Sequence, residues 1–274
     1  MNIKEVLTEK FNYTNGIYFS SHNEGLSYPE EGNNFYYKLE DNSYWFNHRN
    51  QVILLLINTY FNKREFLDIG GGNGFNSLSL QESIENVYML EPGFQGCLNA
   101  QSRGVTNIIC STLSDLIQES VSFDSIGLFD VLEHINDDIE FLNDINKVLE
   151  NEGHLILTVP AFNFLWSKED VDAGHYRRYK KKELVNKIEN AGFSVEFSSY
   201  FFSILTLPIF FFRAIPSYFL NKSQDSKSTE NQHKLPDNFI GRMINAFLRK
   251  ELIDLKKLRS KRFGSSLIIV AKKI

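Results

Sequence analysis

The residues best suited to chemistry in this sequence are an acidic side chain and a run of small residues that follows it. Asp68 ends a short apolar run, and the turn after it contains Gly70, Gly71, Gly72, Asn73 and Gly74. Glycine adopts positive φ without strain and lets a ligand lie against backbone amides where the next helix begins. A carboxylate before such a turn suits a nucleotide-like ligand that carries an ammonium group.

The spacing of these glycines argues against one class of nucleotide site and favours another. The dinucleotide fingerprint of dehydrogenases needs its third glycine at the position of Phe75. Glu91 ends the next apolar run and is followed by Pro92, and a carboxylate at this point accepts hydrogen bonds from the hydroxyls of a ribose. Asp68 and Glu91 therefore predict two contacts to one nucleoside ligand.

At these residues the sequence resembles the class I S-adenosylmethionine-dependent methyltransferases, whose first motif is an acidic residue followed by alternating glycines. The block from Phe123 to Ile135 resembles the fourth-strand motif of that family, and the run from Gly174 to Tyr179 resembles its segment after the fifth strand. The resemblance covers residues 44–200 and, more thinly, 264–273. It implies a transferase whose cofactor is S-adenosyl-L-methionine and whose product is S-adenosyl-L-homocysteine.

The resemblance also implies cofactor contacts in later segments. Phe129 and Asp130 would flank the methionine part of the cofactor. Thr112 and Leu113 follow the third predicted strand, at the position where the protein would contact the edge of the adenine ring.

Two histidines are the candidates for acid-base chemistry. An alcohol that attacks a methyl group must lose a proton, and a side chain with a pKa near neutrality can accept it. His175 is the first choice by type and position and His134 is the second, although either could be a hydrogen-bonded structural residue. Asp130 and Glu133 could join His134 around a divalent metal ion, but a capped turn before the next helix explains the same carboxylates. We therefore expect no metal ligands.

Six further residues are predicted to contact the acceptor: Trp45, Arg49, Trp166, Asp172, Arg177 and Arg178. The two adjacent arginines would hold a carboxylate or a phosphate, unless one of them pairs with Asp170 or Asp172. Packing within the N-terminal helix is the alternative for Trp45.

The acceptor that we expect is a sugar, or a lipid-linked or phosphorylated glycan, methylated on oxygen. The alternatives are a small aromatic, quinone-like or lipid-like molecule, and a binding module that holds the cofactor without turnover. The loop after the fifth predicted strand begins Thr158-Val159-Pro160-Ala161 and lacks the Asn/Asp-Pro-Pro-aromatic run that favours methylation of base amino groups. We therefore expect no nucleic-acid partner.

A layered α/β fold would bring these residues together. We expect a Rossmann-like, seven-stranded, mostly parallel sheet with helices on both faces and an antiparallel last strand, because ligands bind at the carboxyl ends of such strands. Residues 1–50 would form an N-terminal lid or arm, residues 51–200 with 264–274 the cofactor-binding domain, and residues 201–263 a helical insertion between the sixth and seventh strands. The 42% of apolar residues are ample for such a core.

The last third of the chain, which includes the insertion, differs in charge from the rest. Residues 1–174 carry 9 Lys and Arg against 26 Asp and Glu, whereas residues 175–274 carry 20 against 8. A basic third of this kind attracts phosphate, an anionic membrane face or an acidic partner, unless its charges only solvate helix faces. We expect peripheral membrane contact through 201–220 and 239–262, with dimer contact or core packing as the alternative.

A membrane crossing is not expected, because Pro208, Arg213 and Pro216 interrupt the apolar run. The first residues lack the basic and apolar regions of a signal peptide, and the two cysteines show no pattern for zinc or a disulfide framework. We therefore expect a cytoplasmic monomer or homodimer associated with the inner face of the membrane.

Overall fold

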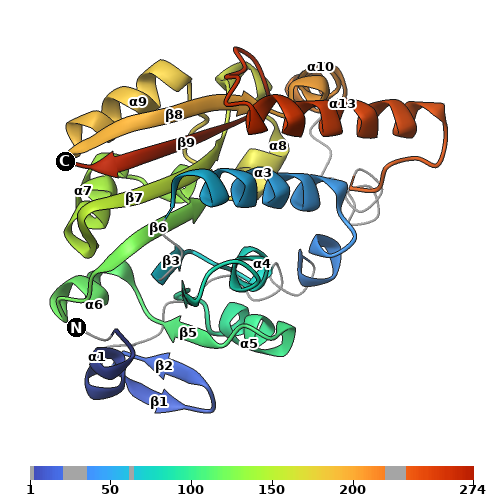
Figure 1. Ribbon diagram of the computed structural model, residues 1–274. Coiled ribbons are helices and arrows are strands. Elements are labelled where there is room, and N and C mark those ends of the chain that lie inside the picture. Colours follow the sequence, from blue (N-terminus) through green and yellow to red (C-terminus); the bar gives the residue numbers. More distant parts are fainter. Residues whose placement is uncertain (1–2, 21–35, 62–64, 220–232) are drawn as a thin grey trace.

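The computed structural model describes residues 3–20, 36–61, 65–219 and 233–274. Figure 1 shows an α/β arrangement in which helices lie against a central twisted sheet. The strand order is β1-β2-β5-β4-β3-β6-β7-β9-β8. The strands are β1 (Asn12–Thr14), β2 (Ile17–Phe19), β3 (Glu65–Ile69), β4 (Asn86–Leu90), β5 (Asn107–Cys110), β6 (Phe123–Phe129), β7 (Leu149–Pro160), β8 (Phe193–Phe201) and β9 (Ser266–Lys273).

The central strands run parallel, and the last strand reverses direction. β3 pairs in parallel with β4 and β6, and β9 pairs antiparallel with both β7 and β8. The central strands are almost wholly buried and nearly continuously apolar, as expected where helices cover both faces of a sheet. The predicted fold class, with its antiparallel last strand, is confirmed.

Helices cover both faces of this sheet. Apolar residues of α1, α6, α7 and α9 pack on one face, and those of α3, α4 and α13 pack on the other. The helices are α1 (Ile3–Lys10), α3 (Tyr44–Tyr60), α4 (Phe75–Gln81), α5 (Phe94–Arg103), α6 (Leu113–Gln118), α7 (Asp138–Val148), α8 (Lys168–Asp172), α9 (Lys181–Asn190), α10 (Thr206–Ile209), α11 (Ile215–Phe219) and α13 (Phe239–Lys256).

Within the part of the chain that the structure describes, the sheet has nine strands, two more than the sequence predicted. The additional strands lie in the region expected to be a lid or arm, where β1 and β2 form a hairpin and β2 pairs in parallel with β5. Strands of three residues are too short to show a period, but the turn Asn15-Gly16 is a strong hairpin signal. Both turn residues have positive φ, as a tight hairpin turn of this type requires.

The insertion between β8 and β9 is helical, as predicted. It contains the short turns η3 (Ser203–Leu205) and η4 (Phe210–Ala214) in addition to α10, α11 and α13. The apolar and basic residues of 239–262 predict one helix over that whole range, but α13 ends at Lys256, because Leu258 adopts a positive φ. The sequence also predicts a polar, disorder-prone stretch from 221 to 233, which lies outside the described residues except for His233. The domain limits at 50, 200 and 263 stay predictions.

None of the helices within the described ranges is long and apolar enough to cross a membrane. Helix α13 instead packs along α3, so that the two helices run side by side over one face of the sheet (Figure 1).

Candidate functional site

The glycine turn after β3 is held open beside the end of β4. The N–H of Gly70 donates to the carbonyl of Leu90 over 2.8 Å. Gly70, Gly72 and Gly74 all have positive φ, which only glycine adopts without strain. A Cβ built on Gly72 would meet nothing within 4 Å, so the backbone is open to a ligand at this point.

Glu91 closes the other side of this turn. Its Oε2 accepts the N–H of Gly72 over 2.9 Å, and its Oε1 accepts the N–H of Gly93 over 2.8 Å. Burial raises the pKa of Glu91, and the two backbone hydrogen bonds oppose that rise. A carboxylate fixed in this way keeps lone pairs that can accept from the hydroxyls of a ligand. Pro92, the next residue, is half-buried beside it.

Asp68 lies beneath the turn, near the end of β3. Its Oδ2 accepts from the hydroxyl of Ser77 over 2.5 Å, while its Oδ1 is buried without a partner among the described residues. Burial raises the pKa of Asp68 to about 7, although Ser77 and the charge of Arg49 oppose the rise. A buried carboxylate oxygen without a donor is where a cationic ligand group gains most.

Four predicted cofactor contacts direct their side chains to the protein. The amide of Asn99 donates to Asn73, and Thr112 caps α6 by accepting the N–H of Asp115. The other two lie in the apolar core: Leu113 and Phe129. The ring of Phe129 stacks parallel to that of Phe66, with centroids 6.5 Å apart.

Asp130 and Arg49 meet at the end of β6. Arg49 reaches from α3 and donates through Nη1 to Oδ2 of Asp130, whose Oδ1 accepts the hydroxyl of Thr158 over 3.0 Å. Asp130 has a positive φ of 59°, which is uncommon for a non-glycine residue and recurs at functional sites. Arg49, which was predicted to contact the acceptor, therefore forms an ion pair with Asp130, which was predicted to contact the cofactor.

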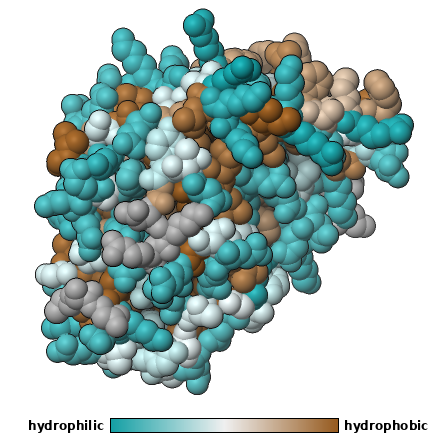
Figure 2. All heavy atoms as spheres, in the orientation of Figure 1, coloured by the Kyte–Doolittle hydropathy of each residue, from teal (hydrophilic) through white to brown (hydrophobic). Residues whose placement is uncertain are grey.

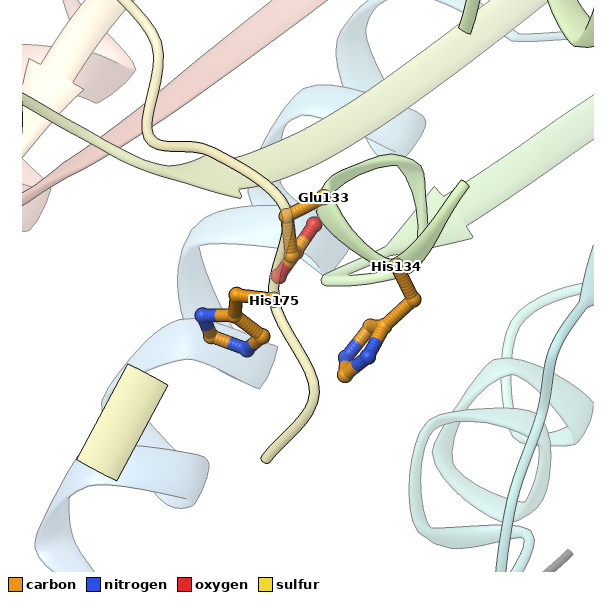
Figure 3. Close-up of side chains that lie close together, drawn as sticks. All are labelled: Glu133, His134 and His175. Atoms are coloured by element: carbon orange, nitrogen blue, oxygen red, sulfur yellow. The ribbon is translucent and has the colours of Figure 1, made fainter. Parts of the chain in front are cut away.

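The two candidate histidines lie together beside a buried carboxyl group (Figure 3). The rings of His134 and His175 pack edge to face, with centroids 4.7 Å apart. Nδ1 of His175 donates to Oδ1 of Asp170 over 2.9 Å, which fixes the orientation of the imidazole. Burial and the nearby His175 lower the pKa of His134 to about 4, so this ring is neutral at physiological pH.

Glu133 completes this cluster with a fully buried side chain. Neither of its oxygens has a hydrogen-bond partner within the described part of the chain, and burial beside Asp130 raises its pKa well above the usual range. One atom each from Glu133, His134 and His175 lie within 4.8 Å of one another. The metal site considered from the sequence consisted of Asp130, Glu133 and His134. In the structure His175, and not Asp130, is the third member of this group.

Asp170 organises the loop after β7. Burial alone would raise its pKa, but hydrogen bonds from His175 and Arg178 lower it to about 2. Arg178 binds both oxygens of Asp170 through Nε and Nη2, at 2.8 and 2.9 Å. This is the pairing that the sequence left open as the alternative to acceptor binding. Nη1 of Arg177 lies 3.0 Å from Oδ2 of Asp138, and its Nη2 donates to the carbonyl of Asn136 over 2.6 Å.

The remaining predicted acceptor residues are dispersed. Trp45 stacks on Phe202 with centroids 3.9 Å apart, so it packs against the insertion, as in the structural alternative. Trp166 is half-buried in the loop after β7, and Asp172 is exposed at the end of α8. No role was predicted for Ser77 or Thr158, although each donates a hydrogen bond to a predicted site carboxylate.

Comparisons with known proteins agree with this geometry. A family model described as "Methyltransferase domain" matches residues 43–196. An uncharacterised protein of Methanocaldococcus jannaschii is 27% identical over 175 residues, which cover 63% of this chain and 72% of that protein. A probable S-adenosylmethionine-dependent methyltransferase of Mycolicibacterium smegmatis is 25% identical over 161 residues, or 58% of this chain and 62% of the relative's length.

A solved structure also shares the fold. Phosphoethanolamine N-methyltransferase 2 of Haemonchus contortus, in complex with S-adenosyl-L-methionine, superimposes with a TM-score of 0.56 and 15% identity. The match covers 90% of this chain and 58% of that enzyme.

Proposed function

We propose a function from the premise that this chain belongs to the methyltransferase domain family and is a class I S-adenosylmethionine-dependent methyltransferase. Its acceptor, in our proposal, is an oxygen of a sugar or of a lipid-linked or phosphorylated glycan. The observation that carries the proposal is an oriented imidazole, His175 on Asp170, at the same edge of the sheet as the open glycine turn.

The residues of the turn fit the cofactor. When bound, S-adenosyl-L-methionine supplies an electrophilic methyl group on a sulfonium centre. Asp68 offers a buried oxygen to which no described residue donates, and this oxygen suits the ammonium group of the methionine part. Glu91 is fixed by two backbone amides and keeps acceptor sites for the two ribose hydroxyls. The bare backbone at Gly72 leaves room between the two carboxylates.

His175 is then the residue that takes the proton from the acceptor hydroxyl. Its Nδ1 is engaged by Asp170, so Nε2 is the nitrogen available as a base. Asp170 remains ionised because its pKa lies near 2, and it stabilises the imidazolium that forms. His134 packs against the same ring and is the second candidate.

A small aromatic, quinone-like or lipid-like acceptor is the second candidate. It is favoured by a group of phenylalanine rings beside the loop after β7, in which Phe164 lies 5.3 Å from Phe162, 5.7 Å from Phe210 and 6.3 Å from Phe263. Phe164 is also exposed, so its ring is available to an incoming apolar group.

Transfer of a labelled methyl group separates these alternatives. The protein would be incubated with S-adenosyl-L-methionine and either lipid-linked oligosaccharide, cell-surface polysaccharide, or a panel of soluble phenols and amines. We expect label in the first two fractions, in a base-stable methyl ether. Turnover confined to phenols would favour the second candidate, confinement to amines would remove both proposed acceptor classes, and cofactor binding without transfer would indicate a binding module.

Affinity for S-adenosyl-L-homocysteine is expected to rise with pH up to about 7 and then level off. Without ligand, Asp68 is protonated below its pKa of about 7, whereas the ammonium group favours the ionised form. Binding should therefore release a proton, and affinity should change by up to about tenfold per pH unit below that pKa. Calorimetry across this range measures both quantities. Asp68→Asn should abolish the slope; a wild-type affinity independent of pH would contradict the prediction.

A further inference from the structure

The insertion exposes an apolar patch that the cofactor site does not use. Its members are large apolar side chains of α10, η4 and the first half of α13: Leu207, Phe211, Phe212, Phe239, Ile240, Met243 and Phe247. Phe212 and Phe239 are 78% and 74% exposed. Figure 2 shows apolar side chains gathered over the end of the molecule that α10 and α13 form in Figure 1. Contiguous patches of this kind mark interaction sites.

Packing of α13 onto the protein does not require these side chains. The helix buries a different face, on which Leu248, Glu251 and Leu255 lie against α3 and η3. Phe239, Met243 and Phe247 recur every four residues and are all exposed, so they form one stripe along the solvent-facing side of the helix, next to the buried face. The helix therefore has two apolar surfaces. One packs on the core, and the other faces solvent.

Basic side chains flank this second stripe. Residues 239–262 contain eight Lys and Arg and two acidic residues, Glu251 and Asp254. Glu251 is buried against His48, and Asp254 pairs with Lys261. The flanking basic side chains on the exposed face of the helix are Arg242, Arg249 and Lys250. The exposed face thus combines apolar anchors with positive charge.

We propose that the patch, with its flanking basic residues, docks the protein on an anionic lipid bilayer. An apolar stripe beside Lys and Arg is the pattern of a helix that lies in the membrane interface, with its rings among the acyl chains and its cations at the headgroups. A second copy of the chain would bring two positive faces together, which opposes self-association. The proposal depends on this surface alone and holds whatever the acceptor is.

Flotation of the full-length protein with vesicles tests it. We expect binding to phosphatidylcholine vesicles that contain phosphatidylglycerol, weaker binding to phosphatidylcholine alone, and loss of the difference at high salt. Phe212→Ser and Phe239→Ser should each weaken binding about tenfold or more, because each removes a large apolar anchor. Arg242→Gln with Arg249→Gln and Lys250→Gln should weaken binding to the anionic vesicles only.

Controls separate docking from folding and from catalysis. Tyr13→Ser and Ile139→Ser remove exposed apolar side chains outside the insertion and should leave vesicle binding unchanged. All these variants should keep the unfolding midpoint and the affinity for S-adenosyl-L-homocysteine. Equal flotation of wild type and the two phenylalanine variants would overturn the proposal. So would a dimer in solution that binds no vesicles and that Phe212→Ser dissociates, since the patch would then be a subunit interface.

Discussion

His175→Asn is expected to lower the rate of methyl transfer by about a hundredfold to ten-thousandfold, the range that a positioned general base contributes. The amide of asparagine can keep the hydrogen bond to Asp170 that Nδ1 makes at 2.9 Å, but it cannot accept a proton. The affinity for S-adenosyl-L-homocysteine should hardly change, because the glycine turn and Glu91 are untouched. Single-turnover transfer of labelled methyl measures the rate.

His154→Asn is the matched control. His154 lies in β7, pairs with Glu196 at 3.3 Å and packs on the ring of Phe61, so it is not part of the cluster of Glu133, His134 and His175, and its replacement should leave the rate unchanged. A wild-type rate in His175→Asn would contradict the assignment. Loss of the wild-type rate after dialysis against a chelator, with recovery on adding zinc or manganese, would show instead that Glu133, His134 and His175 hold an ion.

Glu251→Ala is expected to lower the free energy of unfolding by about 3–5 kcal/mol, the cost of breaking a buried pair by removing one partner. Glu251 lies on α13 and is 5% exposed. Its carboxylate accepts from Nε2 of His48 over 3.0 Å and from the N–H groups of Phe202 and Ser203 over 2.8 and 3.0 Å. Truncation leaves these buried donors without an acceptor, and urea unfolding measures the loss.

Asp254→Ala is the control on the same helix. Asp254 pairs with Lys261 and Arg259 at the surface, where ion pairs contribute little, so the urea midpoint should hardly move. Glu251→Gln keeps part of the hydrogen bonding and should fall between wild type and Glu251→Ala. An unchanged midpoint in Glu251→Ala would mean that α13 and α3 are held together by apolar packing alone.

The fold could be predicted where the sequence signal was long and local. β3, β4 and β6 are mostly apolar and almost wholly buried, and each is followed by turn or acidic residues, which is the pattern of a parallel sheet covered on both faces. β1 and β2 have three residues each and are stabilised by pairing with β5, a contact distant in sequence. Only the turn Asn15-Gly16 indicated them.

The site shows the same division between local and distant contacts. The glycine turn lies in one unit of strand, turn, helix and strand, so spacing alone placed Asp68 and Glu91 on its two sides. Residues after neighbouring parallel strands meet at one edge, which is why His134 and His175 come together. The partner of Arg178 could not be chosen from sequence, because Asp170 and Asp172 both lie in the same short segment before it and their side-chain directions are set by the fold of the loop.

The directions of the side chains at the end of β6 also could not be predicted from the sequence. Phe129 is the last residue of β6, and its ring stacks on Phe66 in the core. Asp130 follows the strand with a positive φ of 59°, and its carboxylate meets Arg49. A positive φ at a residue other than glycine is uncommon, so the sequence did not predict this change of direction.

The central claim is that Asp68 and Glu91 bind one sulfonium nucleoside on either side of the glycine turn. Titration calorimetry with S-adenosyl-L-homocysteine tests it most directly, on wild type and on the double variant Asp68→Asn with Glu91→Gln. We predict one saturable site per chain in wild type, and no saturable heat in a double variant that still unfolds cooperatively. No heat in wild type, or wild-type affinity in the folded double variant, would contradict the account.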